Sequence, residues 1–275
     1  MRGTDDYSRR VPAALVLPTY QEADNIVRLL TAVREQCPDL HVIVMDDNSP
    51  DGTAELARGV AEQLGDVDVV VRPVKEGLGA AYRHGFRYAL DRSYDPIAQM
   101  DADFSHDPEV LPLLLAEVAR GADVAVGSRY VPGGAVPNWT LSRRLLSRWG
   151  NGYAKFMLRL RLQDATTAFR VYRADTLERI DIDGTRANGY LFQIETAFRL
   201  SDCGARIVEL PITFLDRVAG ASKMAVVRTM VETELRVTWW GISLRLPGLS
   251  DRFRTTGPGR FLEARIRPVG PPSGH

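Results

Sequence analysis

The chain is poor in the residues that build disulfide frameworks, metal clusters and nucleophilic triads. Its 275 residues include only Cys37 and Cys203, which lie far apart and form no metal-ligand spacing. This cysteine usage excludes a disulfide-stapled scaffold and is typical of a reducing compartment. The histidines also lack metal-ligand spacing and a serine or cysteine partner, so we expect them to be structural or exposed.

Long apolar runs and a net charge are missing as well. No stretch approaches the roughly 18 uncharged apolar residues of a transmembrane helix, and residues 1–10 do not resemble a signal peptide. The 35 basic and 35 acidic residues give a net charge of zero. This balance argues against nucleic acid as a partner. Any membrane contact is therefore expected to be peripheral or made through a partner.

Short apolar runs alternate with helical patterns through the first half of the chain. We predict strands at residues 13–17, 42–45, 67–71, 97–100 and 124–126, and helices at 26–33, 53–64, 79–90 and 108–119. This alternation predicts an α/β fold whose mostly parallel sheet carries helices on both faces. In the second half we predict helices at 142–162, 191–200 and 229–244, and strands at 169–172 and 207–210.

We divide the chain into three parts. Residues 12–245 are expected to form one domain, preceded by a flexible N-terminus at 1–11. Residues 246–275 are rich in Arg, Pro and Gly and have few large apolar side chains, so we predict a disordered tail.

Two carboxylates follow the fourth predicted strand. Asp101 and Asp103 are one residue apart, so in an extended segment they point to the same side. Open α/β sheets bind ligands at this end of their strands. Two converging anions favour a hard divalent cation that keeps substrate phosphates as further ligands. The pattern indicates a metal–diphosphate site, with a solvated acidic loop as the alternative.

Polar segments also end the first two predicted strands. In PTYQE at 18–22, an aromatic ring and a carboxylate could hold the base and ribose of a nucleotide. The alternative is a loop that leads into the first turn of a helix. DDNSPDGT at 46–53 is compatible with a turn and a helix cap. Two acids are costly to bury unpaired at a strand end, however, and nucleotide hydroxyls would satisfy them.

Small residues begin the helix after the third predicted strand, in KEGLGAAYRHG at 75–85. They would let a diphosphate approach the N–H groups of the helix start. The segment is neither a dinucleotide fingerprint nor a P-loop, because Tyr82 occupies the third glycine position. A tight strand–helix junction explains the same residues equally well.

Cations gather after the fifth predicted strand. Arg129 would lie near Asp103 if neighbouring strands end together. Its planar guanidinium suits phosphate oxygens, and a salt bridge to one of these acids is the alternative. Residues 142–161 contain six cations and no acid. Arg143 and Ser147 share a helix face and can jointly hold a phosphate. The basic, aromatic-rich pattern favours an anionic membrane surface, with a solvated face as the alternative.

DRVAGASK at 216–223 is the last motif, and we interpret it as a mobile lid whose Arg217 and Lys223 neutralise phosphate. Solvent-exposed cations are the alternative. Together the motifs resemble family 2 glycosyltransferases of the GT-A fold, and more closely the polyprenyl- or dolichyl-phosphate mannose synthases. The resemblance covers roughly residues 12–245. Its more specific pieces are DDNSPDGT at 46–53, DADFSH at 101–106 and the R-x-x-x-x-S-K pattern at 217–223.

The resemblance implies a Rossmann-like GT-A catalytic domain and a role for individual residues. The nucleotide sugar would be bound by Pro18, Tyr20, Glu22, Asp47, Asp51, Gly77, Ala102, Arg217 and Lys223. The catalytic residues would be Asp101, Asp103 and Arg129, and a Mg²⁺ or Mn²⁺ ion would be held by Asp101, Asp103 and Ser105. The acceptor phosphate would be bound by Arg129, Arg143 and Ser147. The chain departs from the family at Lys75-Glu76, where Asn is frequent, and at Thr167-Ala168, where Ser-Gly is frequent.

The implied reaction is inverting transfer of mannose from GDP-mannose to a polyprenyl (dolichyl-type) phosphate, which yields a lipid-linked sugar donor. Such an enzyme would be cytoplasmic and peripheral at the cytoplasmic face, held by the membrane surface or by a membrane-anchoring subunit. Three alternatives stay open: UDP-glucose or another nucleotide sugar as donor, a protein or polysaccharide glycosyltransferase, and a non-catalytic nucleotide-binding subunit of a membrane complex.

Overall fold

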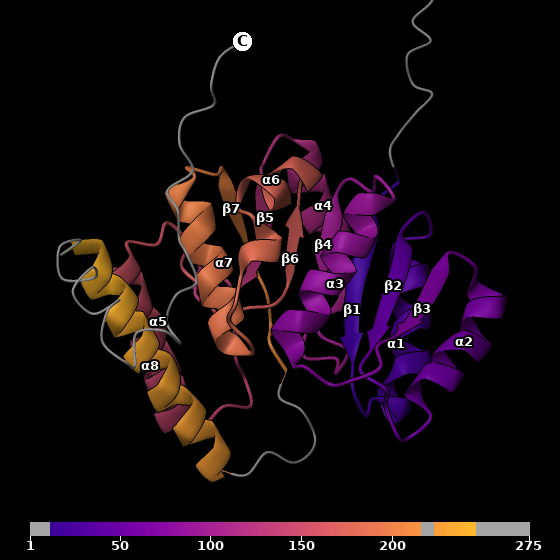
Figure 1. Ribbon diagram of the computed structural model, residues 1–275, viewed down its shortest axis with the longest axis horizontal. Helices are drawn as coiled ribbons and strands as arrows, with labels where there is room; N and C mark the ends of the chain where they lie inside the picture. Colours follow the sequence, from indigo (N-terminus) through magenta and orange to yellow (C-terminus); the bar gives the residue numbers. More distant parts are fainter. Residues whose placement is uncertain (1–11, 216–222, 246–275) are drawn as a thin grey trace, which may run out of the picture.

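The computed structural model describes residues 12–215 and 223–245, which build one central sheet with helices packed against it (Figure 1). The seven strands lie in the order β3-β2-β1-β4-β6-β5-β7. Their bounds are Ala14–Thr19 (β1), His41–Asp46 (β2), Val67–Val71 (β3), Ile97–Gln99 (β4), Val124–Ser128 (β5), Arg170–Tyr172 (β6) and Ile207–Pro211 (β7). Only β6 runs antiparallel to its neighbours among these strands. The predicted α/β fold with a mostly parallel sheet is confirmed.

Helices follow most strands, as the apolar periodicity predicts. They are Ala23–Gln36 (α1), Thr53–Leu64 (α2), Leu78–Asp91 (α3), Leu111–Ala119 (α4), Leu141–Leu158 (α5), Ala174–Arg179 (α6), Tyr190–Asp202 (α7) and Lys223–Arg245 (α8), with 3₁₀ turns at Pro108–Val110 and Ile182–Gly184. The short helix α6 was not predicted. The prediction of a helix up to residue 162 was too long, because Arg159 adopts a left-handed conformation with φ 53° and ends α5 at Leu158.

The core has two halves, one on each face of the sheet, because successive strand residues point to opposite faces. Ala14 and Val16 of β1 pack on the side of α3 and α7, whereas Leu15 and Leu17 pack on the side of α1 and α4. Burial of each of the larger side chains, Leu15, Val16 and Leu17, contributes about 1.5–3 kcal/mol relative to exposure. The resulting layers hold the strand ends in fixed positions.

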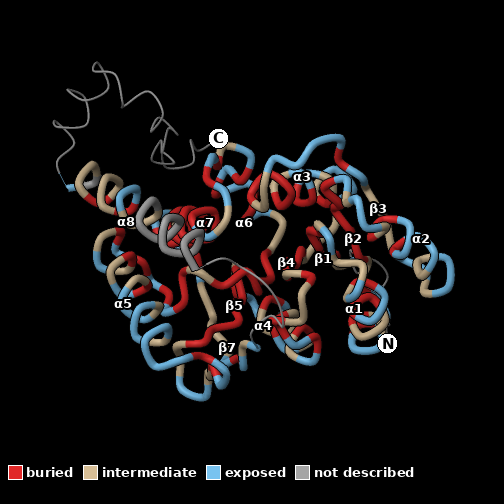
Figure 2. The backbone as a smooth tube through the Cα atoms, turned by 90° about the horizontal axis from the view of Figure 1, so that it is seen from below, coloured by how far each residue is buried: buried red, intermediate tan, exposed pale blue. Residues whose placement is uncertain are grey.

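Helices α5 and α8 form a pair beside the main body of the molecule (Figure 1). The Tyr153 and Thr238 hydroxyls are 2.6 Å apart across this pair, and Gly241 lies close against Met157. Exposed residues of α5 lie on its outer side (Figure 2). No helix in the described part of the chain is both long and apolar enough to cross a membrane. The predicted terminal segments, 1–11 and 246–275, lie outside the described residues.

Candidate active site

The predicted nucleotide loops meet at the carboxyl ends of β1 and β2. These strands pair in parallel with Pro18 opposite Met45 and Thr19 opposite Asp46, so their following loops begin side by side. The buried Asp46 carboxylate joins the loops, since it accepts hydrogen bonds from Thr19 Oγ1 at 2.8 Å and Ser49 Oγ at 2.6 Å. Asp46 thus has a structural role, and β4 lies on the other side of β1 at the same edge of the sheet.

Asp47 is held by a cation that the sequence analysis missed. Its Oδ1 lies 2.8 Å from Nη1 of Arg72, and both side chains are buried. Nη2 of Arg72 lies 2.6 Å from Oε2 of Glu76. Burial raises the pKa of Asp47, and the charge of Arg72 acts in the opposite direction. Arg72 follows β3 directly, so a cation at a strand end was the signal that could have revealed it.

The next part of the nucleotide loops is shaped by Tyr20 and Asp51. Nζ of Lys75 lies 3.3 Å from the centre of the Tyr20 ring. Asp51 Oδ1 accepts from Thr53 N at 3.1 Å and from Thr53 Oγ1 at 2.6 Å, while Oδ2 accepts from Ala23 N at 3.2 Å. Burial opposes ionisation, but these hydrogen bonds lower the pKa of Asp51. Asp51 therefore links α1 to the start of α2, and its contact with a nucleotide stays a prediction.

The two carboxylates that follow β4 are half-buried and are positioned by the surrounding chain. Asp101 Oδ1 accepts a hydrogen bond of 2.9 Å from Tyr82 Oη, and Asp103 Oδ1 accepts one of 3.0 Å from Ser105 N. Burial, reinforced by the Asp101 charge, raises the pKa of Tyr82, so its hydroxyl keeps its proton. Phe104 adopts φ 58° between these residues, a left-handed conformation that tightens the loop.

These residues fit a hard divalent cation. The donor set consists of oxygens, the atoms that Mg²⁺ and Mn²⁺ prefer. Ser105 Oγ is buried and has no hydrogen-bond partner among the described residues, so it is a suitable third donor. No group of three His, Cys, Asp or Glu side chains that could hold a metal occurs in residues 12–215 and 223–245. An ion held by Asp101, Asp103 and Ser105 would complete its coordination with water or substrate oxygens.

The start of α3 is a tight strand–helix junction. Gly77 has φ 95°, and a Cβ atom added to Gly79 would lie 2.4 Å from the carbonyl oxygen of Ala187. Asn188 Nδ2 donates to the Glu76 carbonyl at 3.3 Å. The tight junction is one of the two interpretations from sequence, and the packing of residues 187–188 against it was not predicted. The contact between Gly77 and a nucleotide sugar remains a prediction.

Arg129 lies in a buried ion pair, as in the alternative interpretation, but its partner is Asp164 and not one of the acids that the sequence analysis considered. Its Nε and Nη2 donate to the two carboxylate oxygens of Asp164, each at 2.7 Å, and Nη2 also donates to Thr166 Oγ1 at 2.6 Å. Burial disfavours the charged form of both side chains. The partner's charge outweighs burial in each case, so the pKa of Arg129 is raised and that of Asp164 is lowered. The expectation that β5 neighbours β4 near Asp103 is wrong, because β6 lies between them.

The other predicted acceptor residues gather next to Arg129. The Arg143 guanidinium lies 4.3 Å from the Trp139 ring, whose centre is 5.7 Å from the Arg129 guanidinium. The Ser147 and Tyr130 hydroxyls are 2.6 Å apart, and the Tyr130 ring lies 5.3 Å from Arg129. We call these five residues the acceptor cluster. The structure thus brings together Arg129, Arg143 and Ser147, through two aromatic residues that the sequence analysis left out.

Phe214 connects the acceptor cluster with the acidic loop. Its ring lies 5.2 Å from the Arg129 guanidinium and 5.6 Å from the His106 ring, and Leu215 N donates to Ser105 O at 3.3 Å. The acceptor cluster and the loop that carries Asp101 and Asp103 are therefore joined by direct contacts. Arg217 lies outside the described residues, and Lys223 begins α8 without a described side chain.

Comparison with known proteins gives close relatives over most of the chain. The sequence is 46% identical over 237 residues to an undecaprenyl-phosphate mannosyltransferase of Micrococcus luteus, covering 86% of this chain and 97% of that protein. It is 45% identical over 235 residues to a polyprenol monophosphomannose synthase of Mycolicibacterium smegmatis, covering 84% and 88%.

Solved structures share the fold at low sequence identity. Glucosyl-3-phosphoglycerate synthase from Mycobacterium tuberculosis, in complex with Mn²⁺, UDP-glucose and phosphoglyceric acid, superposes with a TM-score of 0.59 at 17% identity, covering 82% of this chain and 77% of that one. TarS from S. aureus, in complex with UDP-GlcNAc, gives 0.55 at 16% identity, covering 92% and 76%. The predicted GT-A type of fold is confirmed by these likenesses. The sequence model for glycosyl transferase family 2 matches residues 14–181, and the chain belongs to this family.

Proposed function

We propose that the protein transfers mannose from GDP-mannose to the phosphate of a polyprenyl phosphate, with inversion at the anomeric carbon. The names of the two relatives support both mannose and a polyprenyl phosphate acceptor. The observation that carries the proposal is the acceptor cluster, a group of hydroxyls and guanidinium groups whose acidic neighbour, Asp164, is already paired with Arg129. Such a cluster suits a phosphate monoester.

The chemistry follows from the charge of the acceptor. A phosphate monoester has a second pKa of about 6, so at neutral pH its oxygen can attack without a strong base. Arg143 and Ser147 would orient this phosphate, and Arg217 and Lys223 would neutralise the donor diphosphate. An ion held by Asp101, Asp103 and Ser105 would supply positive charge for the leaving diphosphate. Attack opposite the leaving group inverts the anomeric centre.

The surroundings of the cluster favour this acceptor over a sugar or protein hydroxyl. A hydroxyl acceptor needs a general base near the anomeric carbon. Asp164 is a poor base, because both of its oxygens accept from Arg129 and the pair lowers its pKa. A non-catalytic subunit would need neither the acidic pair nor the hydrogen bond from Tyr82 to Asp101.

The test is a transfer assay with labelled GDP-mannose and UDP-glucose, each offered a short polyprenyl phosphate or the matching polyprenol. We expect labelled lipid only from GDP-mannose with the phosphorylated acceptor. Equal turnover of UDP-glucose would contradict the donor, and transfer to polyprenol would contradict the phosphate acceptor.

Replacement of Arg143 by glutamine should raise KM for polyprenyl phosphate by about 10- to 100-fold, since a hydrogen bond to a charged group contributes about 1.5–3 kcal/mol. KM for GDP-mannose should stay unchanged. Steady-state kinetics with each substrate varied measures both values. Arg161→Gln, which removes an exposed cation beyond the end of α5, is the control. A rise in the KM for GDP-mannose instead would contradict the assignment.

We also propose that α5 rests on an anionic membrane surface. Its outer side exposes Leu145, Trp149 and Phe156, and the same helix carries Arg144 and Lys155 without any acid. Large apolar side chains beside cations are typical of interfacial helices. This surface adjoins the acceptor cluster, since Arg143 and Ser147 belong to the same helix.

Joint replacement of Leu145, Trp149 and Phe156 by serine should reduce flotation with anionic vesicles at least tenfold, because each exposed ring or chain contributes apolar area to binding. The fold should survive, because all three side chains are exposed and their printed contacts, Trp149 with Tyr153 and Phe156 with Arg245, lie at the helix surface. The matched control replaces the exposed Leu56, Val74 and Leu113 by serine. A wild-type protein that never floats would favour a membrane-anchoring subunit instead.

A further inference from the structure

Tyr82 is a buried side chain that contacts Asp101, the first carboxylate of the acidic pair. It is fully buried on α3, and its hydroxyl donates to Asp101 Oδ1 at 2.9 Å. The sequence analysis named Tyr82 only as the residue that occupies the third glycine position of the segment 75–85. Its hydroxyl, however, ends at a carboxylate that the chain presents at the ligand-binding edge of the sheet.

Helix α3 cannot easily shift relative to the sheet, because two glycines bring it into close contact with its neighbours. A Cβ atom at Gly85 would lie 2.2 Å from Val16 of β1, and one at Gly79 would lie 2.4 Å from the Ala187 carbonyl oxygen. Tyr82 lies between them, three residues from each, and is therefore a neighbour of both on the helix surface. The helix position therefore fixes the depth of the Tyr82 ring.

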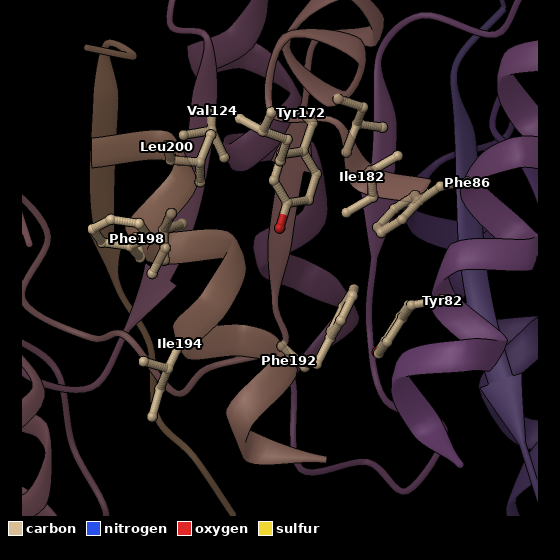
Figure 3. Packing of buried hydrophobic residues seen from close by; sticks show 14 of the residues in the cluster. Tyr82, Phe86, Val124, Tyr172, Ile182, Phe192, Ile194, Phe198 and Leu200 are labelled. Atoms are coloured by element: carbon tan, nitrogen blue, oxygen red, sulfur yellow. The ribbon is translucent and has the colours of Figure 1, made fainter. Parts of the chain in front are cut away.

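Aromatic neighbours fix the plane of that ring as well. The rings of Tyr82 and Phe192 are stacked at 5.8 Å with an interplanar angle of 5°, and Figure 3 shows them facing each other between α3 and α7. The Phe86 ring lies at 5.9 Å from Tyr82 and at 20° to it. Because the Tyr82 ring is fixed in position and plane, the hydrogen bond from its hydroxyl restricts rotation of the Asp101 carboxylate.

We propose that Tyr82 is a positioning residue that holds the Asp101 carboxylate in the orientation needed to bind a divalent cation together with Asp103. This inference rests on the proposed metal site of the transferase. Hydrogen bonds to a ligating carboxylate orient it, and their removal typically weakens metal binding by about 10- to 100-fold. The hydroxyl of Tyr82 acts through Asp101 and has no contact with the sugar in this scheme.

The experiment measures Mn²⁺ binding directly, by electron paramagnetic resonance of free Mn²⁺ in the presence of GDP, for the full-length wild type and Tyr82→Phe. We expect the dissociation constant of Mn²⁺ to rise about 10- to 100-fold in the variant. Transfer activity should recover when Mn²⁺ is raised by the same factor. Tyr88→Phe is the matched control, because Tyr88 also belongs to α3 and donates at 2.9 Å to a carboxylate, that of Asp68.

The outcomes separate this inference from the proposed function. Equal Mn²⁺ affinity of wild type and Tyr82→Phe would overturn the positioning role while leaving the transferase proposal intact. A wild type that transfers mannose but binds no Mn²⁺ would overturn both the metal site and this role. A melting temperature of Tyr82→Phe close to that of Tyr88→Phe, with weaker metal binding only in the former, supports it and excludes a merely structural effect.

Discussion

Replacement of Asp103 by alanine is expected to lower kcat/KM for mannose transfer by about 10³-fold or more, with the protein still folded. Loss of one group that stabilises developing charge commonly costs 10²- to 10³-fold, and loss of a metal ligand removes the charge of the ion as well. Asp103 lies in the loop after β4 and is only half-buried, so truncation of its side chain leaves no large cavity. Initial-rate kinetics with GDP-mannose and polyprenyl phosphate checks the loss.

Asp107→Asn is the control for this variant. Asp107 lies in the same loop and its carboxylate accepts from Glu109 N, a capping role that asparagine can take over. Circular dichroism and thermal melting should show both variants folded. Undiminished turnover of Asp103→Ala would refute the proposed use of the acidic pair.

The second large effect concerns stability. Replacement of Asp164 by alanine should lower the free energy of unfolding by about 3–5 kcal/mol, because it leaves Arg129 buried without its counter-charge. Urea or guanidinium unfolding measures this loss. Combining Arg129→Met with Asp164→Leu should recover most of the stability, since apolar residues often replace a buried pair without penalty. Mannose transfer should remain impaired in the double variant.

The same ion pair predicts a pH dependence. Pairing with Arg129 lowers the pKa of Asp164 in the folded state, so the pair stabilises the fold above the ordinary aspartate pKa of about 3.9. This contribution is lost as the pH falls through the lower folded-state pKa. The difference in unfolding free energy between wild type and Asp164→Ala should therefore shrink below about pH 4. A difference that is constant from pH 7 to pH 2 would contradict this linkage.

Sequence periodicity predicted much of the scaffold. The helix predicted at 53–64 is observed as α2, and the apolar runs before Asp47 and Asp101 are β2 and β4. Such elements are predictable because their pattern records which face meets the core. The position of the acidic pair after a parallel strand followed from the same pattern. Local pattern alone therefore places both acids at the carboxyl ends of the parallel strands, where open α/β sheets bind ligands.

Long-range partners were beyond the reach of sequence patterns. Asp164 is 35 positions from Arg129, and Phe214 is farther still along the chain from His106. Neither pairing has a local signal, because it depends on how loops fold against each other. The hydrogen bond from Tyr82 was hidden for another reason: a tyrosine on an apolar helix face is usually explained by its ring alone.

Strand direction was also hidden, since a run of three residues carries no sign of which way it crosses a sheet. The reversal of β6 has a consequence for how the protein can change. A reversed strand delivers the residues before it, rather than those after it, to the ligand edge, and this is how Asp164 and Thr166 reach Arg129. The proposed donor half of the site lies in the loops after β1, β2, β3 and β4. The proposed acceptor half depends on the segment before β6, so we expect changes at 160–168 that keep the Arg129–Asp164 pair to alter acceptor binding while the donor loops stay as they are.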